Sequence, residues 1–163
     1  MAIRERQGGG PDGAAARKFL TFELDGETYG VGIRTVREII GNMDITPVPQ
    51  APGYVRGVVN LRGRIVPVVD LRRRLGIGGD VPASRSCIVV VDTQATGARG
   101  QAGMIVDAVS EVVAIPEADI EPPPEIGGGA AGVVDALARV RDKVVILLSI
   151  DKTLAGVGDV AAA

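Results

Sequence analysis

The segment Val55–Leu71, VRGVVNLRGRIVPVVDL, most restricts what this chain can fold into. Two runs of β-branched residues flank a short polar stretch, in which Gly63 can adopt the positive φ of a tight reversal. Pro67, in the second run, cannot donate a backbone hydrogen bond, which places that run at a sheet edge or a bulge. The segment therefore predicts a two-stranded hairpin within a small, curled sheet.

Composition extends this prediction to the rest of the chain. Aromatic residues make up only 2% of the 163 residues, so Val, Ile and Leu must form most of the core. β-Branched side chains suit a pleated surface better than a helix, which favours strands. The formal net charge of −2 argues against a nucleic-acid binder, because such proteins need a basic face.

Several classes of site are excluded by what the chain lacks. There is no histidine, which rules out His-dependent catalytic triads and His-ligated metal sites. The single cysteine, Cys87, begins a valine run and is interpreted as a small core residue. No apolar stretch approaches the ~20 residues that span a bilayer, and no secretory signal is visible. We therefore expect a cytoplasmic protein without a catalytic residue, metal or cofactor.

Local patterns predict individual elements. Asp25-Gly26 indicates a hairpin turn. Thr35–Ile40 has apolar residues at helical spacing and predicts a short helical turn, and Asp70–Leu75 and Asp151–Leu154 predict two more. Gly103–Ile115 is mostly apolar and predicts one long strand.

The charged residues near these elements have ordinary interpretations. The run Arg72-Arg73-Arg74 is interpreted as a solvated connector. Asp70 and Asp107 end or interrupt apolar runs, which capping or solvation explains. These interpretations assign the five positions no function.

The chain also contains an internal repeat. Gly30–Ile40 lies without gaps over Gly103–Val113, at an offset of 73 residues. Both copies next reach a Gly-Val-Val triplet, Gly57–Val59 and Gly132–Val134, at an offset of 75. The repeat predicts an all-β fold of two small barrels packed together, each of about five strands, which is about the least that a curled sheet needs.

The repeat also suggests domain limits. Residues 1–17 are predicted to be a disordered tail, and residues 153–163 a loose C-terminal tail. The folded region is 18–152, with a first barrel at roughly 18–78 and a second at roughly 85–152. Strands can be exchanged between the two barrels.

Four segments carry a resemblance to a known family. VRGVVNLRGRIVPVVDLRRRLG closely resembles the signature of the CheW family, the adaptors of bacterial chemotaxis, and its Asn-Leu-Arg-Gly turn is the most specific part. FELDGETYGVGIRTVREII, ITPVPQAPGYVRG and GMIVDAVSEVVAIPEADIEPPP also match. The resemblance covers about residues 18–152 and implies two five-stranded SH3-like barrels, in agreement with the repeat.

The resemblance implies a non-enzymatic adaptor. Members of this family bind the regulatory domain of the histidine kinase CheA and the cytoplasmic tip of chemoreceptors, so the protein is expected to be recruited to membrane-associated receptor arrays. A groove between the two lobes can accept a helical receptor tip. Each contact is expected to bury about 1,000 Å² or less. Neither nucleic-acid binding nor direct membrane insertion is expected.

The resemblance also points to a partner-binding surface. Its predicted residues are Ile33, Val36, Glu38, Asn60, Arg62 and Gly63. We predict that Glu38 and Arg62 pair and brace the receptor-facing surface, although each can also be a separate solvated charge. Ile33 and Val36 are exposed apolar contacts or, more commonly for such residues, core. Asn60 is expected to hydrogen-bond within its own turn. Glu111, the repeat counterpart of Glu38, receives no role, because no matching arginine at a bend is found.

Two other classes of function remain open. A small-molecule-binding or sensing β-barrel could use the space between the lobes, but polar anchors for a ligand are scarce. An enzyme would be limited to carboxylate chemistry, and no paired carboxylate motif is visible.

Overall fold

The computed structural model describes residues 5–7, 15–41, 43–79, 85–93, 100–123, 132–155 and 157. The strands are β1 (Glu5–Gln7), β2 (Ala16–Leu24), β3 (Glu27–Gly32), β4 (Val36–Ile40), β5 (Val55–Leu61), β6 (Arg64–Asp70), β7 (Cys87–Asp92), β8 (Gln101–Val106), β9 (Ala108–Pro116), β10 (Ile120–Glu121), β11 (Val134–Val140) and β12 (Lys143–Leu148). The short helices are η1 (Ile33–Thr35), α1 (Leu71–Arg74), η3 (Glu117–Asp119) and α2 (Ile150–Thr153). No helix in these ranges is both long and apolar enough to cross a membrane.

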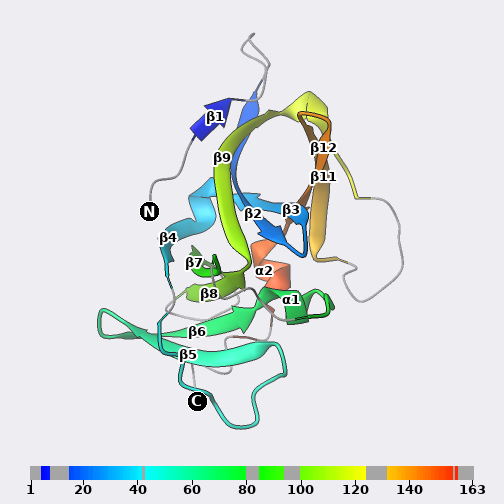
Figure 1. The fold of residues 1–163 in the computed structure, drawn as a ribbon. Coiled ribbons are helices and arrows are strands. Elements are labelled where there is room, and N and C mark those ends of the chain that lie inside the picture. Colours follow the sequence, from blue (N-terminus) through cyan, green and yellow to red (C-terminus); the bar gives the residue numbers. More distant parts are fainter. Residues whose placement is uncertain are drawn as a thin grey trace.

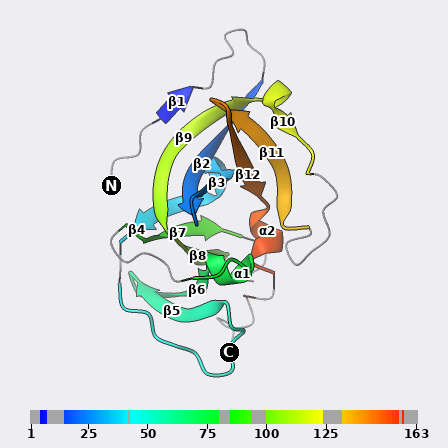
Figure 2. The ribbon, with the colours of Figure 1, turned by 45° about the vertical axis from the view of Figure 1, so that its right-hand side comes forward.

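The strands form two curled sheets, one above the other in Figure 1. The upper barrel is the sheet β1-β9-β2-β3-β12-β11-β10, and the lower barrel is the sheet β4-β7-β8-β6-β5. Helices α1 and α2 lie where the two barrels meet (Figure 2). The predicted all-β fold of two packed barrels with short helical turns is confirmed.

The two barrels are built from exchanged hairpins. The β2–β3 hairpin pairs with β9 and β12, whereas the β7–β8 hairpin pairs with β4 and β6. Each barrel therefore takes strands from both predicted halves, 18–78 and 85–152, so the sequence halves and the barrels do not coincide. The limits of the folded region stay a prediction, and most of the two predicted tails lies outside the described residues.

Tight turns of one kind close three hairpins. Asp25-Gly26, Arg62-Gly63 and Arg141-Asp142 each place two successive residues at positive φ. Such turns match the right-handed twist of the strands that they join. The predicted turns at Asp25-Gly26 and Gly63 are confirmed.

Three apolar clusters hold the fold together. One fills the upper barrel around Phe19 and Leu147, and another fills the lower barrel around Val68 and Ile88. The third and largest joins the two sheets and contains Phe22. Val, Ile and Leu dominate all three clusters, as the scarcity of aromatic residues predicted.

The matching glycines of the repeat occupy equivalent crowded positions. A Cβ on Gly30 would lie 3.0 Å from Leu147 Cδ2, and one on Gly103 would lie 2.6 Å from Ile88 Cγ2. Gly30 lies where β3 runs parallel to β12, and Gly103 lies where β8 runs parallel to β6. Glycine at these positions leaves room for the neighbouring core side chains, whereas any larger residue would overpack the barrel interior.

Two local predictions were wrong. Thr35–Ile40 is not a helical turn: Thr35 ends η1 and the following residues form β4, because pairing with β7 overrides a helical pattern of only six residues. The predicted strand Gly103–Ile115 is interrupted at Asp107, where the chain passes from the lower barrel to the upper one. The helical turns at the ends of β6 and β12 are confirmed, with Asp70 and Ser149 as their N-caps.

Candidate partner-binding surface

The turn between β5 and β6 is organised by its own side chains. The backbone N–H of Gly63 donates a 2.9 Å hydrogen bond to Oδ1 of Asn60. This bond supports the left-handed conformation of Arg62, at φ 53°, which is unusual for a residue with a side chain. The predicted local role of Asn60 is confirmed, and the turn presents the arginine outward.

The arginine of this turn reaches a carboxylate on the far edge strand of the lower barrel. Nη2 of Arg62 donates to Oε1 of Glu38 on β4. The Arg62 side chain is 73% exposed and that of Glu38 26%. The pairing predicted from the sequence is therefore present, as a surface ion pair that joins the two edge strands, β4 and β5, of one barrel.

Ile33 and Val36 lie beside this surface but are not free apolar contacts. Both are half-buried and pack against the cluster that joins the two barrels. Of the two interpretations left open by the sequence, core is the better one. They position the backbone that carries Glu38.

A second arginine–glutamate pair occupies the equivalent place on the upper barrel. Nη2 of Arg141, in the β11–β12 turn, donates to both carboxylate oxygens of Glu111 at 2.9 Å. Glu111 lies on β9 as Glu38 lies on β4, and Arg141 has a φ of 48°. The conclusion that Glu111 lacks a matching arginine was wrong.

Arg141 was missed because the repeat was aligned in the wrong register at this point. The Gly-Val-Val match used an offset of 75, whereas strand pairing equates Val55–Val69 with Val134–Leu148, an offset of 79. At that offset Arg62 corresponds to Arg141. The signal that could have revealed it is the spacing from each turn to the helix N-cap that follows, Asp70 or Ser149.

A buried ion pair joins the two barrels. Arg72 on α1 donates from Nε to Oδ1 of Asp107 at 2.8 Å and from Nη2 to Oδ2 at 2.5 Å, and both side chains are 8% exposed. Asp107 also accepts from the backbone N–H of Asp25 at 2.9 Å, and Arg72 donates to the carbonyl of Gly78 at 2.8 Å. The hydrogen bond from Arg72 lowers the pKa of Asp107, although burial opposes this. The same bond raises the pKa of Arg72.

The run of three arginines is thus not a solvated connector. Arg72 is buried, and Nε of Arg74 donates to the carbonyl of Thr153 on α2 at 2.7 Å. The Arg74 guanidinium also lies over the ring of Tyr54. Asp70 caps α1 as expected, but neither capping nor solvation describes Asp107.

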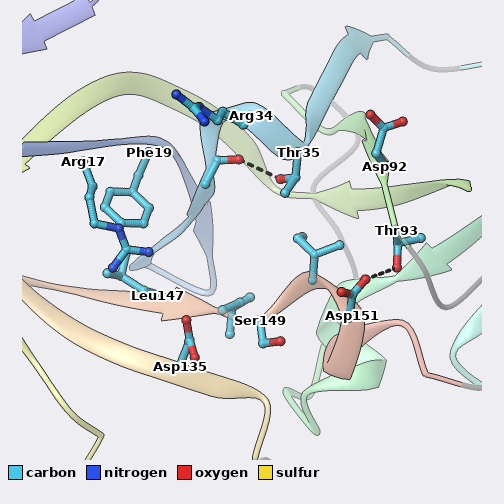
Figure 3. A pocket seen from close by; sticks show the side chains of 13 residues that line it. Arg17, Phe19, Arg34, Thr35, Asp92, Thr93, Asp135, Leu147, Ser149 and Asp151 are labelled. Atoms are coloured by element: carbon cyan, nitrogen blue, oxygen red, sulfur yellow. Dashed lines mark hydrogen bonds between the residues drawn. The ribbon is translucent and has the colours of Figure 1, made fainter.

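A groove with a volume of about 430 Å³ lies between the barrels, on the side shown in Figure 3. Its walls are the start of β2, the crossover from β3 to β4, the end of β7 and the start of α2. Two of its lining residues are joined by a hydrogen bond, which Thr93 Oγ1 donates to Asp151 Oδ1 at 2.7 Å. The charged lining residues are Arg17, Arg34, Asp92, Asp135 and Asp151.

The described residues offer little for catalysis or metal binding. Cys87 is buried in the core, as predicted, and burial raises the pKa of its thiol, which disfavours the reactive thiolate. Within the described ranges no three His, Cys, Asp or Glu side chains are grouped to hold a metal ion. The described surface can recognise a partner through ion pairs and apolar contacts.

Comparison with known proteins gives consistent matches. A family model described as CheW-like domain matches residues 18–157. Chemotaxis protein CheW of Rhizobium meliloti (strain 1021) is 39% identical over 110 residues, 68% of each chain. That of Klebsiella aerogenes is 34% identical over 141 residues, 85% of this chain and 81% of the other. The crystal structure of scaffolding protein TtCheW from Thermoanaerobacter tengcongensis has a TM-score of 0.80 at 36% identity, covering 88% of this chain and 96% of that chain.

Proposed function

The chain belongs to the CheW family of chemotaxis adaptors, and on that basis we propose that it couples the cytoplasmic tip of a chemoreceptor to the regulatory domain of a CheA-type histidine kinase. The family match over residues 18–157 carries this proposal. The named relatives are chemotaxis and scaffolding proteins, so neither an enzyme nor a small-molecule sensor is favoured. Its receptor contact would recruit the protein to membrane-associated arrays.

The proposal assigns a role to the Glu38–Arg62 pair and its turn. The pair braces the outer edges of the lower barrel, and Asn60 and Gly63 hold the turn that presents the arginine. Because the arginine is largely exposed, it is available to a carboxylate of the partner as well as to Glu38. Ile33 and Val36 support this surface from below.

The groove between the barrels is the second surface that we assign to receptor binding. Its lining includes Phe19 and Leu147, which are only 2–3% exposed, and charged side chains stand along its rim, so a helical segment would be held there mainly by those charges. We assign it to the helical receptor tip. Each contact is modest in size, and an array gains strength from many such contacts acting together.

Binding assays with the purified chain test the coupling role. The chain is titrated with a CheA regulatory domain and, separately, with a receptor cytoplasmic fragment, and receptor control of kinase activity is measured in the mixture. Binding to both partners supports the proposal. A chain that binds neither would end it, whatever the fate of individual residues.

Arg62→Glu tests the surface, with Arg141→Glu as the matched control on the other barrel. Both replace an exposed turn arginine that pairs with a glutamate, so both should change the unfolding free energy by only about 1 kcal/mol or less. Arg62→Glu should weaken receptor coupling, and Arg141→Glu should not. If the Arg62→Glu variant couples receptor to kinase normally, the Glu38–Arg62 surface is not the receptor-facing one.

A further inference from the structure

The two crossovers between the barrels are equivalent positions of the repeat. The chain passes from β3 to β4 at η1 and from β8 to β9 at Asp107, and the strand registers on both sides equate Arg34 with Asp107. In the same way α1 follows β6 as α2 follows β12, which equates Arg72 with Asp151. The pair Arg34–Asp151 is therefore the repeat counterpart of the pair Asp107–Arg72.

We call each crossover, together with the helix residue that corresponds to it, a joint. The two joints carry the same two charges in reversed positions. At one joint the crossover supplies the carboxylate of Asp107 and the helix supplies the guanidinium of Arg72, and the two form the buried pair. At the other joint the crossover supplies Arg34 and the helix supplies Asp151. The combined length of the two side chains is therefore the same at both crossovers.

The second joint is open in this structure. Arg34 is exposed, and no ion pair joins it to another of the described residues. Figure 3 shows its guanidinium pointing away from Asp151, which accepts a hydrogen bond from Thr93. Both residues line the groove between the barrels. The open joint and the groove are therefore the same feature.

We propose that Arg34 and Asp151 form a reversible ion pair that closes this groove, as the charge-reversed counterpart of the permanent Arg72–Asp107 joint. The permanent pair is shielded from water and held by Asp25 and Gly78 as well. Arg34 has no such support and faces solvent, where an ion pair is weak and screened by salt. The closed and open states of the groove are therefore close in free energy, so a binding partner can open it at little cost.

Distance measurements on the free protein test this closure. Spin labels are placed on the two walls that the pair would draw together, at Thr35→Cys in the crossover and at Lys152→Cys on α2, with the buried Cys87 left in place and its lack of labelling checked in the parent chain. We expect two distance populations at low salt. The shorter population should be lost in Arg34→Gln and in about 0.5 M salt, where the Debye length falls well below 10 Å.

The charge-swapped variant Arg34→Asp/Asp151→Arg provides the decisive comparison. It should restore the shorter population, because it reproduces the charge order of the Arg72–Asp107 joint. Arg139→Gln, which removes an exposed arginine paired with Glu121 outside the groove, should leave both populations unchanged. A single population in all variants, or a shorter population that survives Arg34→Gln, would overturn the proposal.

The consequence for partner binding rests on the proposed function. If the groove receives the receptor tip, Arg34→Gln should raise the association rate of a receptor fragment, because the groove no longer closes. If the association rate were unchanged while the distance measurements gave the expected result, the groove would not be the receptor site, but the proposed ion pair would still stand. The two failures are therefore distinguishable.

Discussion

Apart from β1 and β10, which only the upper barrel has, the two barrels share their strand order, strand directions and bulge positions, yet they differ in the contacts at the crossovers between them. One crossover is fastened by a buried arginine and aspartate, and the equivalent crossover opens onto a groove. Because each barrel borrows a hairpin from the other half of the sequence, neither sheet can close alone. The fastened joint therefore stabilises the whole molecule, whereas the open joint leaves a surface that can change.

The first and largest test compares the two joints directly. Asp107→Asn leaves the buried guanidinium of Arg72 without its counter-charge, which should cost about 3–5 kcal/mol of unfolding free energy in urea. Asp151→Asn at the equivalent place should cost about 1 kcal/mol or less, because Asp151 is exposed and an asparagine oxygen can still accept the hydrogen bond from Thr93.

A double variant separates charge from packing at the fastened joint. Arg72→Met/Asp107→Leu replaces both charges with apolar groups and should be more stable than either single substitution. It also gives a readout if a single variant fails to fold. Equal losses for Asp107→Asn and Asp151→Asn would remove the difference between the joints.

The next test compares the bulges at the starts of β5 and β11. Gly57 has a φ of 144°, and a Cβ there would lie 2.1 Å from the carbonyl oxygen of Thr46. The equivalent residue is Ala136, which packs in the core of the upper barrel. Gly57→Ala should destabilise the protein by about 1–3 kcal/mol or more through overpacking and strain.

The reverse substitution serves as its control. Ala136→Gly should cost only about 1 kcal/mol, from backbone entropy and lost packing. Thermal and urea unfolding of both variants provide the measurement. If the two losses were similar, the contact with Thr46 would not explain why the lower barrel has glycine here.

A smaller, pH-dependent effect is expected from the fastened joint. The pKa of Asp107 is lowered in the folded protein, chiefly by its hydrogen bond from Arg72. The stabilisation is therefore complete above the ordinary carboxyl pKa of 3.8 and is lost as the pH falls through the lower folded value. The stability difference between the parent chain and Asp107→Asn should shrink on acidification below about pH 4. A difference that stays constant would contradict this.

The sequence predicted the barrels because their signals are local. The turn at Asp25-Gly26, the β-branched runs and the matching glycines Gly30 and Gly103 each constrain the backbone within a few residues. The exchange of hairpins has no such signal, because an exchanged strand pairs with the same kinds of side chain. The strand Val36–Ile40 was missed for the same reason: pairing with β7 decided it, not its own spacing.

The candidate site was predicted in part. Glu38 and Arg62 pair as expected, but the Arg72–Asp107 pair joins residues 35 positions apart in two runs that look like exposed or interrupting charges. Burial of both side chains comes from the packing of α1 against the crossover, which no local pattern encodes. Arg141 was missed through a register error of four residues, so for that residue the information was present in the sequence.

The smallest expected difference lies between the two turn arginines. Glu111 is 16% exposed and Glu38 26%, and the backbone of Glu111 is fixed by Thr21 Oγ1, which donates to its carbonyl at 2.9 Å and accepts from its N–H at 3.2 Å. A more buried and better-held carboxylate loses less freedom when it pairs. Double-mutant cycles with Glu→Gln and Arg→Gln should therefore give a larger coupling for Glu111–Arg141, with both couplings within about 1 kcal/mol. A larger coupling for Glu38–Arg62 would instead make that pair a structural brace, and its exposure to a partner would then matter less than its hold on the two edge strands.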